Sequence, residues 1–260
     1  MKAVLMGKHK RSAVGALEHL LESGWEVPAV VAPPPDTGVA AEQRLDLAAG
    51  RHGLRLATDE ELYADIDELA DVDLVLSFLF WKRIRVPLIE LPRLGCINFH
   101  PAPLPDMRGI GGYNVAILEG WSEWGVSAHF VDEELDTGDL VQVDRFPIEP
   151  DSETALSLDL RSQERLLRAF QSVVDRALAG EELPRVPQGQ GRYVSRAEFE
   201  ELRRVQPGET KEMLARRIRA FWYPPHDGAT LEVAGRVVTL VDRRLLEEAA
   251  AAYRDAGIFS

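Results

Sequence analysis

The sequence holds very little cysteine and no long apolar run. Cys96 is the single cysteine among 260 residues, so an internal disulfide is excluded and a zinc site built from several thiolates cannot form. No apolar stretch approaches the roughly 18 residues that a membrane-spanning helix needs. The N-terminal MKAVLMGKHKR places its short apolar run before its basic residues, the reverse of a signal peptide. We therefore expect a cytoplasmic protein with no membrane partner.

Positive charge is scarce as well. The chain has 30 Lys and Arg against 43 Asp and Glu, a formal net charge of −13. Proteins that bind nucleic acid use Lys and Arg to displace counterions from phosphates, so this balance argues against RNA or DNA as the main partner. It leaves room for a local basic patch that binds a small phosphorylated ligand.

Several cofactor and metal motifs are missing too. There is no H-E-x-x-H, no G-x-x-x-x-G-K-[ST], and no G-x-G-x-x-G after the first apolar run. A zinc hydrolase, a P-loop enzyme and an NAD enzyme are therefore all disfavoured, and we expect no metal.

The spacing of apolar residues predicts strands that alternate with helices. Residues 2–7 and 25–33 are apolar runs, and 12–24 between them has helical spacing. This β-α-β start predicts a parallel sheet with a right-handed crossover. Further strands are expected at 54–58, 71–80 and 95–102, further helices at 40–52, 111–120 and 152–179, and a loop with a short helix at 81–92.

The second half departs from this alternation. Residues 124–135 and 139–149 resemble strands, and the short turn between them makes the pair antiparallel. We predict an α/β fold with a Rossmann-like, mostly parallel sheet covered by helices on both faces, followed by a small C-terminal α+β subdomain. The subdomain should contain a helix at 209–221, a β-hairpin at 229–242 and a helix at 244–254. The expected domains are 1–182 (catalytic), 183–193 (a linker rich in Pro and Gly) and 194–260 (the subdomain).

Polar residues stand at the end of the fifth predicted strand. Asn98 and His100 alternate with apolar residues, so their side chains share one face. Open α/β sheets place their sites beyond the carboxyl ends of the strands. Asp136 follows in a Gly-containing turn. Alone, His100 could cap a strand, Asn98 could serve a turn, and Asp136 could belong to a surface loop.

Together the three side chains form a set suited to acyl transfer. An Asn amide can donate a hydrogen bond to a carbonyl oxygen that becomes negative under attack. A His can accept the proton of an incoming amine or donate to that oxygen, and an Asp can hold the imidazole in the required tautomer. No G-x-S-x-G supplies a nucleophile. This combination predicts direct acyl transfer to an external nucleophile.

The motifs NFHPAPLPDMRG (98–109) and DEELDTGDL (132–140) resemble those of the N10-formyltetrahydrofolate-dependent formyltransferases. That family includes methionyl-tRNA formyltransferase, glycinamide ribonucleotide formyltransferase and the sugar N-formyltransferases. Residues 77–84 resemble the segment before the family's folate pocket, and 216–238 resemble the start of the small C-terminal domain of the tRNA and sugar enzymes. The resemblance implies a folate-dependent N-formyltransferase that uses 10-formyltetrahydrofolate as donor, with Asn98, His100 and Asp136 as catalytic residues.

The resemblance also implies which residues contact the folate. The expected folate contacts are Lys82, Arg83, Ile84, Leu104, Asp132, Glu133, Glu134 and Leu135. Many members have a proline three residues after the Gly of the first motif, where this chain has Gly112. Local features of the sequence indicate the acceptor contacts. KHKR (8–11) precedes a predicted helix, where a phosphate can bind, and FWYPP (221–225) can stack a nucleobase; a solvated basic face and packing of the C-terminal part are the alternatives. The expected acceptor contacts are Lys8, His9, Lys10, Tyr113, Asn114, Trp222 and Tyr223.

The acceptor itself stays open at this point. The short C-terminal part and the acidic charge favour a nucleotide-linked amino sugar over methionyl-tRNA. Other acceptors are a small amine of the hydroxyornithine kind, or water in a hydrolase, and a non-catalytic folate or nucleotide binder is a further alternative. A homodimer through residues 124–149 or the C-terminal part is also expected.

Overall fold

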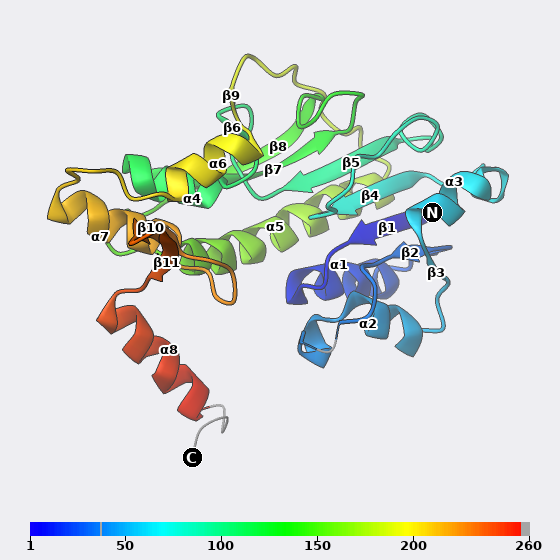
Figure 1. The fold of residues 1–260 in the computed structure, drawn as a ribbon. Helices are drawn as coiled ribbons and strands as arrows, with labels where there is room; N and C mark the ends of the chain where they lie inside the picture. The colour runs from blue at the N-terminus through cyan, green and yellow to red at the C-terminus, as the bar shows by residue number, and fades with distance from the viewer. Residues whose placement is uncertain (37, 256–260) are drawn as a thin grey trace. The chain divides into compact units, whose positions relative to one another are not determined.

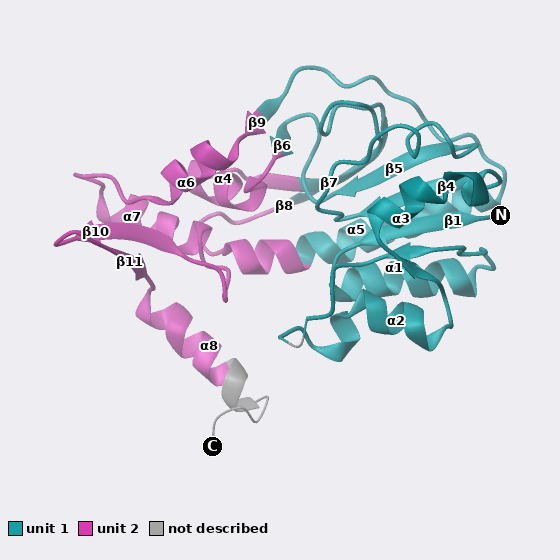
Figure 2. Cartoon of the chain, turned by 45° about the vertical axis from the view of Figure 1, so that its right-hand side comes forward, with its two compact units in different colours: residues 1–108, 125–146, 161–192 teal, residues 109–124, 147–160, 193–260 magenta. Residues whose placement is uncertain are grey.

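The computed structural model describes residues 1–36 and 38–255 (Figure 1). The chain forms two compact units that are interleaved along the sequence (Figure 2). Unit 1 contains residues 1–108, 125–146 and 161–192, and unit 2 contains residues 109–124, 147–160 and 193–260. The domain boundaries expected at 182 and 193 stay a prediction. Among the described helices, none has the length and apolar character needed to span a membrane.

Unit 1 is built on a seven-stranded mixed sheet with the order β3-β2-β1-β4-β5-β7-β8. The first five of these strands pair in parallel, and β7 pairs antiparallel to β5. The fold class predicted from the sequence is thereby confirmed. The strands are β1 (Ala3–Gly7), β2 (Val30–Val31), β3 (Leu56–Ala57), β4 (Leu74–Phe78), β5 (Gly95–His100), β7 (Glu123–Phe130) and β8 (Leu140–Pro147).

Helices cover both faces of the sheet because its strands are apolar on both sides. Ala3 and Leu5 of β1 pack in one core with α1 (Arg11–Glu22), α2 (Leu45–Arg51) and α5 (Ala155–Leu178). Val4 and Met6 point to the other face. There they pack with α3 (Asp59–Ala64), the 3-10 helix η2 (Ile66–Leu69), and Ile84 and Leu88 of the loop after β4. Figure 1 shows α1 and α2 together on one side of β1.

Several predicted elements differ from the structure. The strand expected at 25–33 is only Val30–Val31, because Pro28 has no N–H for a ladder and Pro33 follows closely. The strand expected at 54–58 is likewise only Leu56–Ala57. No helix forms within 81–92, where Pro87 begins a single turn and Pro92 ends it.

Three helical segments also departed from the prediction. The helix expected at 40–52 is split into the 3-10 helix η1 (Ala41–Gln43) and α2. The helices α3 and α6 (Arg196–Arg203) were not predicted, since each is short. The capping box of Thr58 and Glu61, in which each side chain binds the other residue's backbone N–H, is a signal that could have located α3.

Unit 2 contains the small antiparallel hairpin that the alternating pattern predicted. Its strands are β10 (Ala229–Val233) and β11 (Arg236–Leu240), which pair antiparallel around Ala234 and Gly235. The helices of this unit are α4 (Gly112–Glu119), α6, α7 (Lys211–Ala220) and α8 (Arg243–Asp255). Asn114 Nδ2 donates a 2.7 Å hydrogen bond to the Ala220 carbonyl, which holds α4 against the end of α7. A short pair, β6 (Met107–Gly109) with β9 (Arg192–Val194), lies where the chain passes between the units.

Candidate active site

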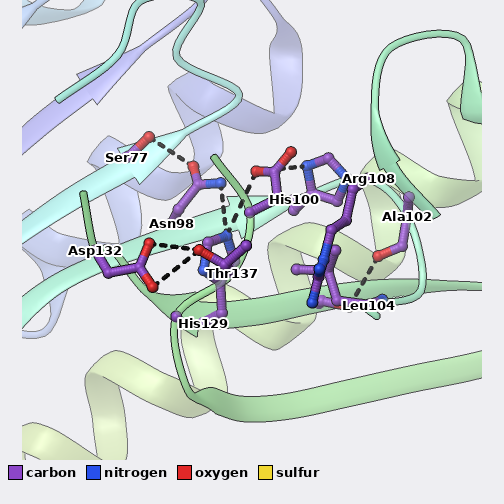
Figure 3. Close-up of polar contacts among 12 residues, drawn as sticks. Ser77, Asn98, His100, Ala102, Leu104, Arg108, His129, Asp132 and Thr137 are labelled. Atoms are coloured by element: carbon purple, nitrogen blue, oxygen red, sulfur yellow. Dashed lines mark hydrogen bonds and ion pairs between the residues drawn. The ribbon is translucent and has the colours of Figure 1, made fainter. Parts of the chain in front are cut away.

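Three adjacent strands place polar side chains in one row. In the sheet register, Asn98 of β5 lies opposite Ser77 of β4 on one side and opposite His129 of β7 on the other. Cross-strand partners point to the same face of a sheet. Ser77, Asn98 and His129 therefore form a line across the carboxyl-end half of β4 and β5, as Figure 3 shows.

Hydrogen bonds connect the whole row. The Phe130 carbonyl can only accept, so the 2.7 Å contact to His129 Nδ1 identifies Nδ1 as the protonated nitrogen of the neutral ring. Nε2 of His129 is then an acceptor, and Asn98 Nδ2 donates to it over 3.0 Å. The opposite end of the amide, Oδ1, accepts from Ser77 Oγ at 2.7 Å. Along the row, every donor thus faces an acceptor.

His129 stays neutral because it is buried. His129 is 2% exposed. Burial and the neighbouring His100 together lower its pKa from 6.5 to about 4. The Asp136 carboxylate opposes this shift only in part. At neutral pH the ring is therefore an acceptor for Asn98 and carries no charge.

The structure brings His100 and Asp136 to the same place. His100 Nδ1 lies 3.5 Å from Asp136 Oδ1, and His129 Nε2 lies 3.8 Å from the same oxygen. Asp136 reaches this position from a turn in which its backbone has a φ of 58°. The three residues predicted as catalytic, Asn98, His100 and Asp136, thus converge at the end of β5.

The turn that carries Asp136 is held by its own side chains. The Asp132 carboxylate accepts the single O–H of Thr137, whose Oγ1 lies 2.7 and 2.9 Å from its two oxygens, and it accepts the Glu134 N–H at 3.1 Å. Gly138 closes the turn, and a Cβ on it would lie 2.0 Å from the Phe130 carbonyl oxygen. Only glycine fits this approach without displacing backbone.

The chain between Pro101 and Leu104 is anchored by a buried hydroxyl. Ser127, which pairs with His100 in the register, donates to the Ala102 carbonyl at 2.8 Å and accepts from the Leu104 N–H at 2.9 Å. Arg108 donates to Gln188 Oε1 at 3.0 Å and to the Gly189 carbonyl at 2.9 Å. Both contacts stabilise the path of the motif that follows His100.

A small cavity of about 80 Å³ opens beside Asn98. Phe80, Ile84 and Leu135 contribute apolar surface, and Asp132 and Glu134 contribute carboxylates. Such a mixture suits a flat, polar heterocycle with N–H donors on its edge. The full lining is Ser77, Phe80, Lys82, Arg83, Ile84, Asn98, His129, Val131, Asp132, Glu134, Leu135 and Asp136.

Six of the eight predicted folate contacts line this cavity, and two lie outside its lining. Glu133 is exposed and belongs to the same turn. Leu104 is buried, and its N–H is bound by Ser127. Lys82 binds Asp59 at 2.5 Å and Glu60 at 3.3 Å, so its ammonium already has carboxylate partners.

The predicted acceptor contacts are divided between the two units. Lys8, His9 and Lys10 follow β1 in unit 1, whereas Tyr113, Asn114, Trp222 and Tyr223 belong to unit 2. Within unit 2, the Tyr223 hydroxyl donates to Asp159 Oδ2 at 2.5 Å, and the rings of Tyr113 and Trp124 are in contact at a tilt of 52°, with centroids 5.5 Å apart. These contacts give Asn114, Tyr113 and Tyr223 structural roles in packing unit 2.

The residues after β1 border a larger hollow of about 550 Å³. Lys8, His9 and the half-exposed Trp81 line it together with the proline-rich segment 33–36. His9 Nε2 lies 3.3 Å from the Pro34 carbonyl oxygen and 3.7 Å from Asp46 Oδ1. The hollow thus combines the Lys8 ammonium with the Trp81 indole ring beside the carboxyl end of β1.

Sequence reasoning missed Ser77, His129 and Thr137. A signal for the first two was present, because each is a polar residue inside a largely apolar stretch, DVDLVLSFLF and GVSAHFV. Within the described part of the chain, no group of three or more His, Cys, Asp or Glu residues is arranged to hold a metal ion.

Comparison with known proteins agrees with this geometry. A family model described as formyl transferase matches residues 29–174, more than half of the chain. The chain is 34% identical over 187 residues to a methionyl-tRNA formyltransferase of Parvibaculum lavamentivorans, covering 69% of this chain and 58% of that protein. A methionyl-tRNA formyltransferase of Halorhodospira halophila is 32% identical over 242 residues, with 89% of this chain and 76% of that protein covered.

A sugar-modifying relative and a solved structure are similar as well. The GDP-perosamine N-formyltransferase of Brucella melitensis is 31% identical over 182 residues, covering 70% of this chain and 68% of that protein. The N-formyltransferase of Helicobacter canadensis, solved with folinic acid and dTDP-3-aminofucose, superposes with a TM-score of 0.75 at 22% identity. The superposition covers 90% of this chain and 85% of that chain. At 22% identity, this similarity supports the fold alone. The chain spans 58% and 51% of the length of two of its methionyl-tRNA formyltransferase relatives.

Proposed function

Since the chain belongs to the formyl transferase family, we propose that it transfers a formyl group from 10-formyltetrahydrofolate to a primary amine. The observation that carries the proposal is the convergence of Asn98, His100 and Asp136 beside the cavity lined by Phe80, Ile84 and Leu135. When bound, the folate would supply the formyl carbon that the amine attacks. The residues of this chain would orient that carbon and move the proton of the amine.

Asn98 is the residue suited to stabilise the developing negative charge. One hydrogen of its amide nitrogen is donated to His129, and the second hydrogen is left for the formyl oxygen. A fixed N–H aimed at an oxygen that becomes negative lowers the barrier, because no reorganisation is needed during the reaction. The neutral His129 keeps the amide in this orientation without adding a competing charge.

His100 and Asp136 are suited to handle protons. The incoming amine forms the new C–N bond as a neutral nucleophile and must then lose a proton. His100 can accept that proton, or donate to the oxygen as a cation, and Asp136 at 3.5 Å stabilises the imidazolium in either case. The proton finally replaces the formyl group on the donor nitrogen when the old C–N bond breaks, so atoms and charge balance.

For the acceptor we propose a nucleotide-linked amino sugar. The similarity to a GDP-perosamine N-formyltransferase supports this class. The hollow lined by Lys8, His9 and Trp81 offers a cation for a phosphate and an indole for a planar ring. The net charge of −13 disfavours a large polyanion.

Methionyl-tRNA is the second candidate acceptor. Its support is the 34% identity to a methionyl-tRNA formyltransferase, although this chain covers only 58% of that protein. A small amine of the hydroxyornithine kind and water are further acceptors that a direct assay would separate from these two.

We also propose that the chain forms a homodimer through its hairpin. Leu231 and Val238 are direct cross-strand partners and are 36% and 39% exposed, and Val233 on the same face is 51% exposed. Their position together on one face of a two-stranded sheet supports the proposal that a partner covers this face.

A panel of acceptors tests the proposed reaction. The protein is incubated with 10-formyltetrahydrofolate and, separately, with GDP-, UDP- and dTDP-linked amino sugars, methionyl-tRNA, hydroxyornithine or buffer alone. Tetrahydrofolate release and the formyl mass gain of the acceptor are measured. We expect one class of nucleotide-linked amino sugar to be formylated, with the rate of the Asn98→Ala variant lower by at least about 10²-fold. Formylation of methionyl-tRNA alone, or release of formate in buffer, would overturn the acceptor assignment.

A further inference from the structure

We infer that Ser77 is a positioning residue for the reaction, because its hydroxyl fixes which edge of the Asn98 amide faces the formyl oxygen. The inference deepens the proposed formyl transfer and rests on it. It assigns a role to a side chain that lies outside the catalytic set of Asn98, His100 and Asp136.

Ser77 is a costly residue at its place in the sheet. It lies in the central strand β4, is 3% exposed, and shares its face of the sheet with the fully buried Val75. A hydroxyl in such surroundings destabilises the fold unless it is hydrogen-bonded. Its partner is Asn98 Oδ1, at 2.7 Å, and the two residues are directly opposite in the register.

The Asn98 amide has two ends of nearly equal size, so shape alone cannot orient it. Ser77 is a donor at one edge, and His129 Nε2 is an acceptor at the other. A half-turn of the amide would direct its oxygen at the lone pair of His129 and would leave the Ser77 proton facing an NH₂ group. Two opposed partners therefore select one orientation, and the second N–H of Asn98 then points in one fixed direction.

The same hydrogen bond strengthens Asn98 as a donor. An amide whose oxygen accepts a hydrogen bond becomes a better donor through its nitrogen, because hydrogen bonds in a chain polarise one another. Ser77 thus both orients Asn98 and increases the positive character of the N–H that would meet the developing oxyanion. Removing the hydroxyl takes away the donor that binds the amide oxygen of the half-buried Asn98.

Substitution of Ser77 tests this role in catalysis. We expect Ser77→Ala to lower kcat about tenfold, the factor that corresponds to one net hydrogen bond, with KM for the folate donor unchanged. Ser77→Thr retains the hydroxyl and should restore most of the rate. Ser162→Ala is the matched control, since Ser162 is 0% exposed and its Oγ has no hydrogen-bond partner within the described residues.

A double-mutant cycle separates positioning from general structural damage. In the Asn98→Ala background, Ser77→Ala should cause no further loss of rate, because the group that Ser77 orients is absent. The inference would be overturned if Ser77→Ala lowered kcat by the same factor in the wild type and in Asn98→Ala. An equal fall in kcat for Ser77→Ala and Ser162→Ala would overturn it as well.

A second measurement does not depend on turnover. The side-chain amide of Asn98 is followed by ¹H–¹⁵N NMR, with its signals assigned from their disappearance in Asn98→Ala. Ser77→Ala should speed rotation and hydrogen exchange of this amide, and Ser162→Ala should leave both unchanged. If the wild type formylates no amine, the proposed function fails while this experiment still decides the role of Ser77. An Asn98 amide that is unaffected by Ser77→Ala would overturn it.

Discussion

Two histidines lie close together at this site and have different environments. Their ring centroids are 6.5 Å apart. His129 is enclosed and donates Nδ1–H to a backbone carbonyl, whereas His100 faces the Asp136 carboxylate. The first ring is thereby suited to orient Asn98, and the second is suited to exchange a proton with the acceptor.

Substitution of the converging residues should remove the reaction while leaving the donor bound. We expect Asn98→Ala, His100→Ala and Asp136→Asn each to lower kcat by at least about 10²-fold, because each removes a charge-stabilising or proton-handling group. Titration calorimetry with tetrahydrofolate should show affinity close to that of the wild type. A variant with near-normal turnover would exclude that residue from the mechanism.

The buried His129 makes stability depend on pH. The pKa of His129 is about 4 in the folded protein and 6.5 ordinarily. Between pH 6.5 and pH 4, therefore, His129 is protonated in the unfolded chain and neutral in the folded chain. The contribution of the neutral His129 to the free energy of unfolding is fully present above pH 6.5 and is lost as the pH falls towards 4. We expect a loss of about 3 kcal/mol in the free energy of unfolding over this range, measured by urea denaturation.

Variants identify His129 as the source of this dependence. His129→Gln removes the titrating group and should flatten the profile. His52→Gln, at an exposed position, should leave the profile unchanged. A wild-type profile that is level between pH 6.5 and 4 would contradict the assignment of a neutral, buried His129.

At the scale of elements, the site depends on the turn between β7 and β8. The turn carries Asp136, and it approaches the Phe130 carbonyl at the end of β7 only because Gly138 lacks a side chain. Asp132 and Thr137 hold the turn through their own hydrogen bonds. The position of Asp136 is thus a property of the whole segment rather than of one residue.

Replacement of Gly138 should disrupt both stability and activity. In Gly138→Ala, the added Cβ would meet the Phe130 carbonyl oxygen at 2.0 Å and must displace backbone. We expect a loss of at least about 2 kcal/mol in the free energy of unfolding and a large fall in kcat. Gly189→Ala is the control, because its Cβ would have no neighbour within 4 Å and its φ is not positive. Equal melting temperatures for the two variants would refute this account of the turn.

At the scale of the whole molecule, the hairpin of unit 2 is the surface from which we expect self-association. Val238→Asp places a charge at the centre of the face shared with Leu231 and Val233. This variant should be monomeric by analytical ultracentrifugation at concentrations where the wild type is a dimer. Thr239→Asp, on the opposite face of the same strand, should leave the dimer intact. A monomeric wild type, or a dimeric Val238→Asp, would exclude the hairpin as the interface.

The sequence by itself determined the fold class and one face of the site. The apolar periods predicted the parallel sheet and the hairpin, and the alternation in β5 placed Asn98 and His100 together, since both properties depend on residues near each other in the chain. The tertiary structure decided which side chains meet Asn98. Ser77 is 21 residues away and His129 is 31 residues away, and both become its neighbours through strand register, which local sequence does not specify. The orientation of the Asn98 amide therefore follows from the assembled sheet.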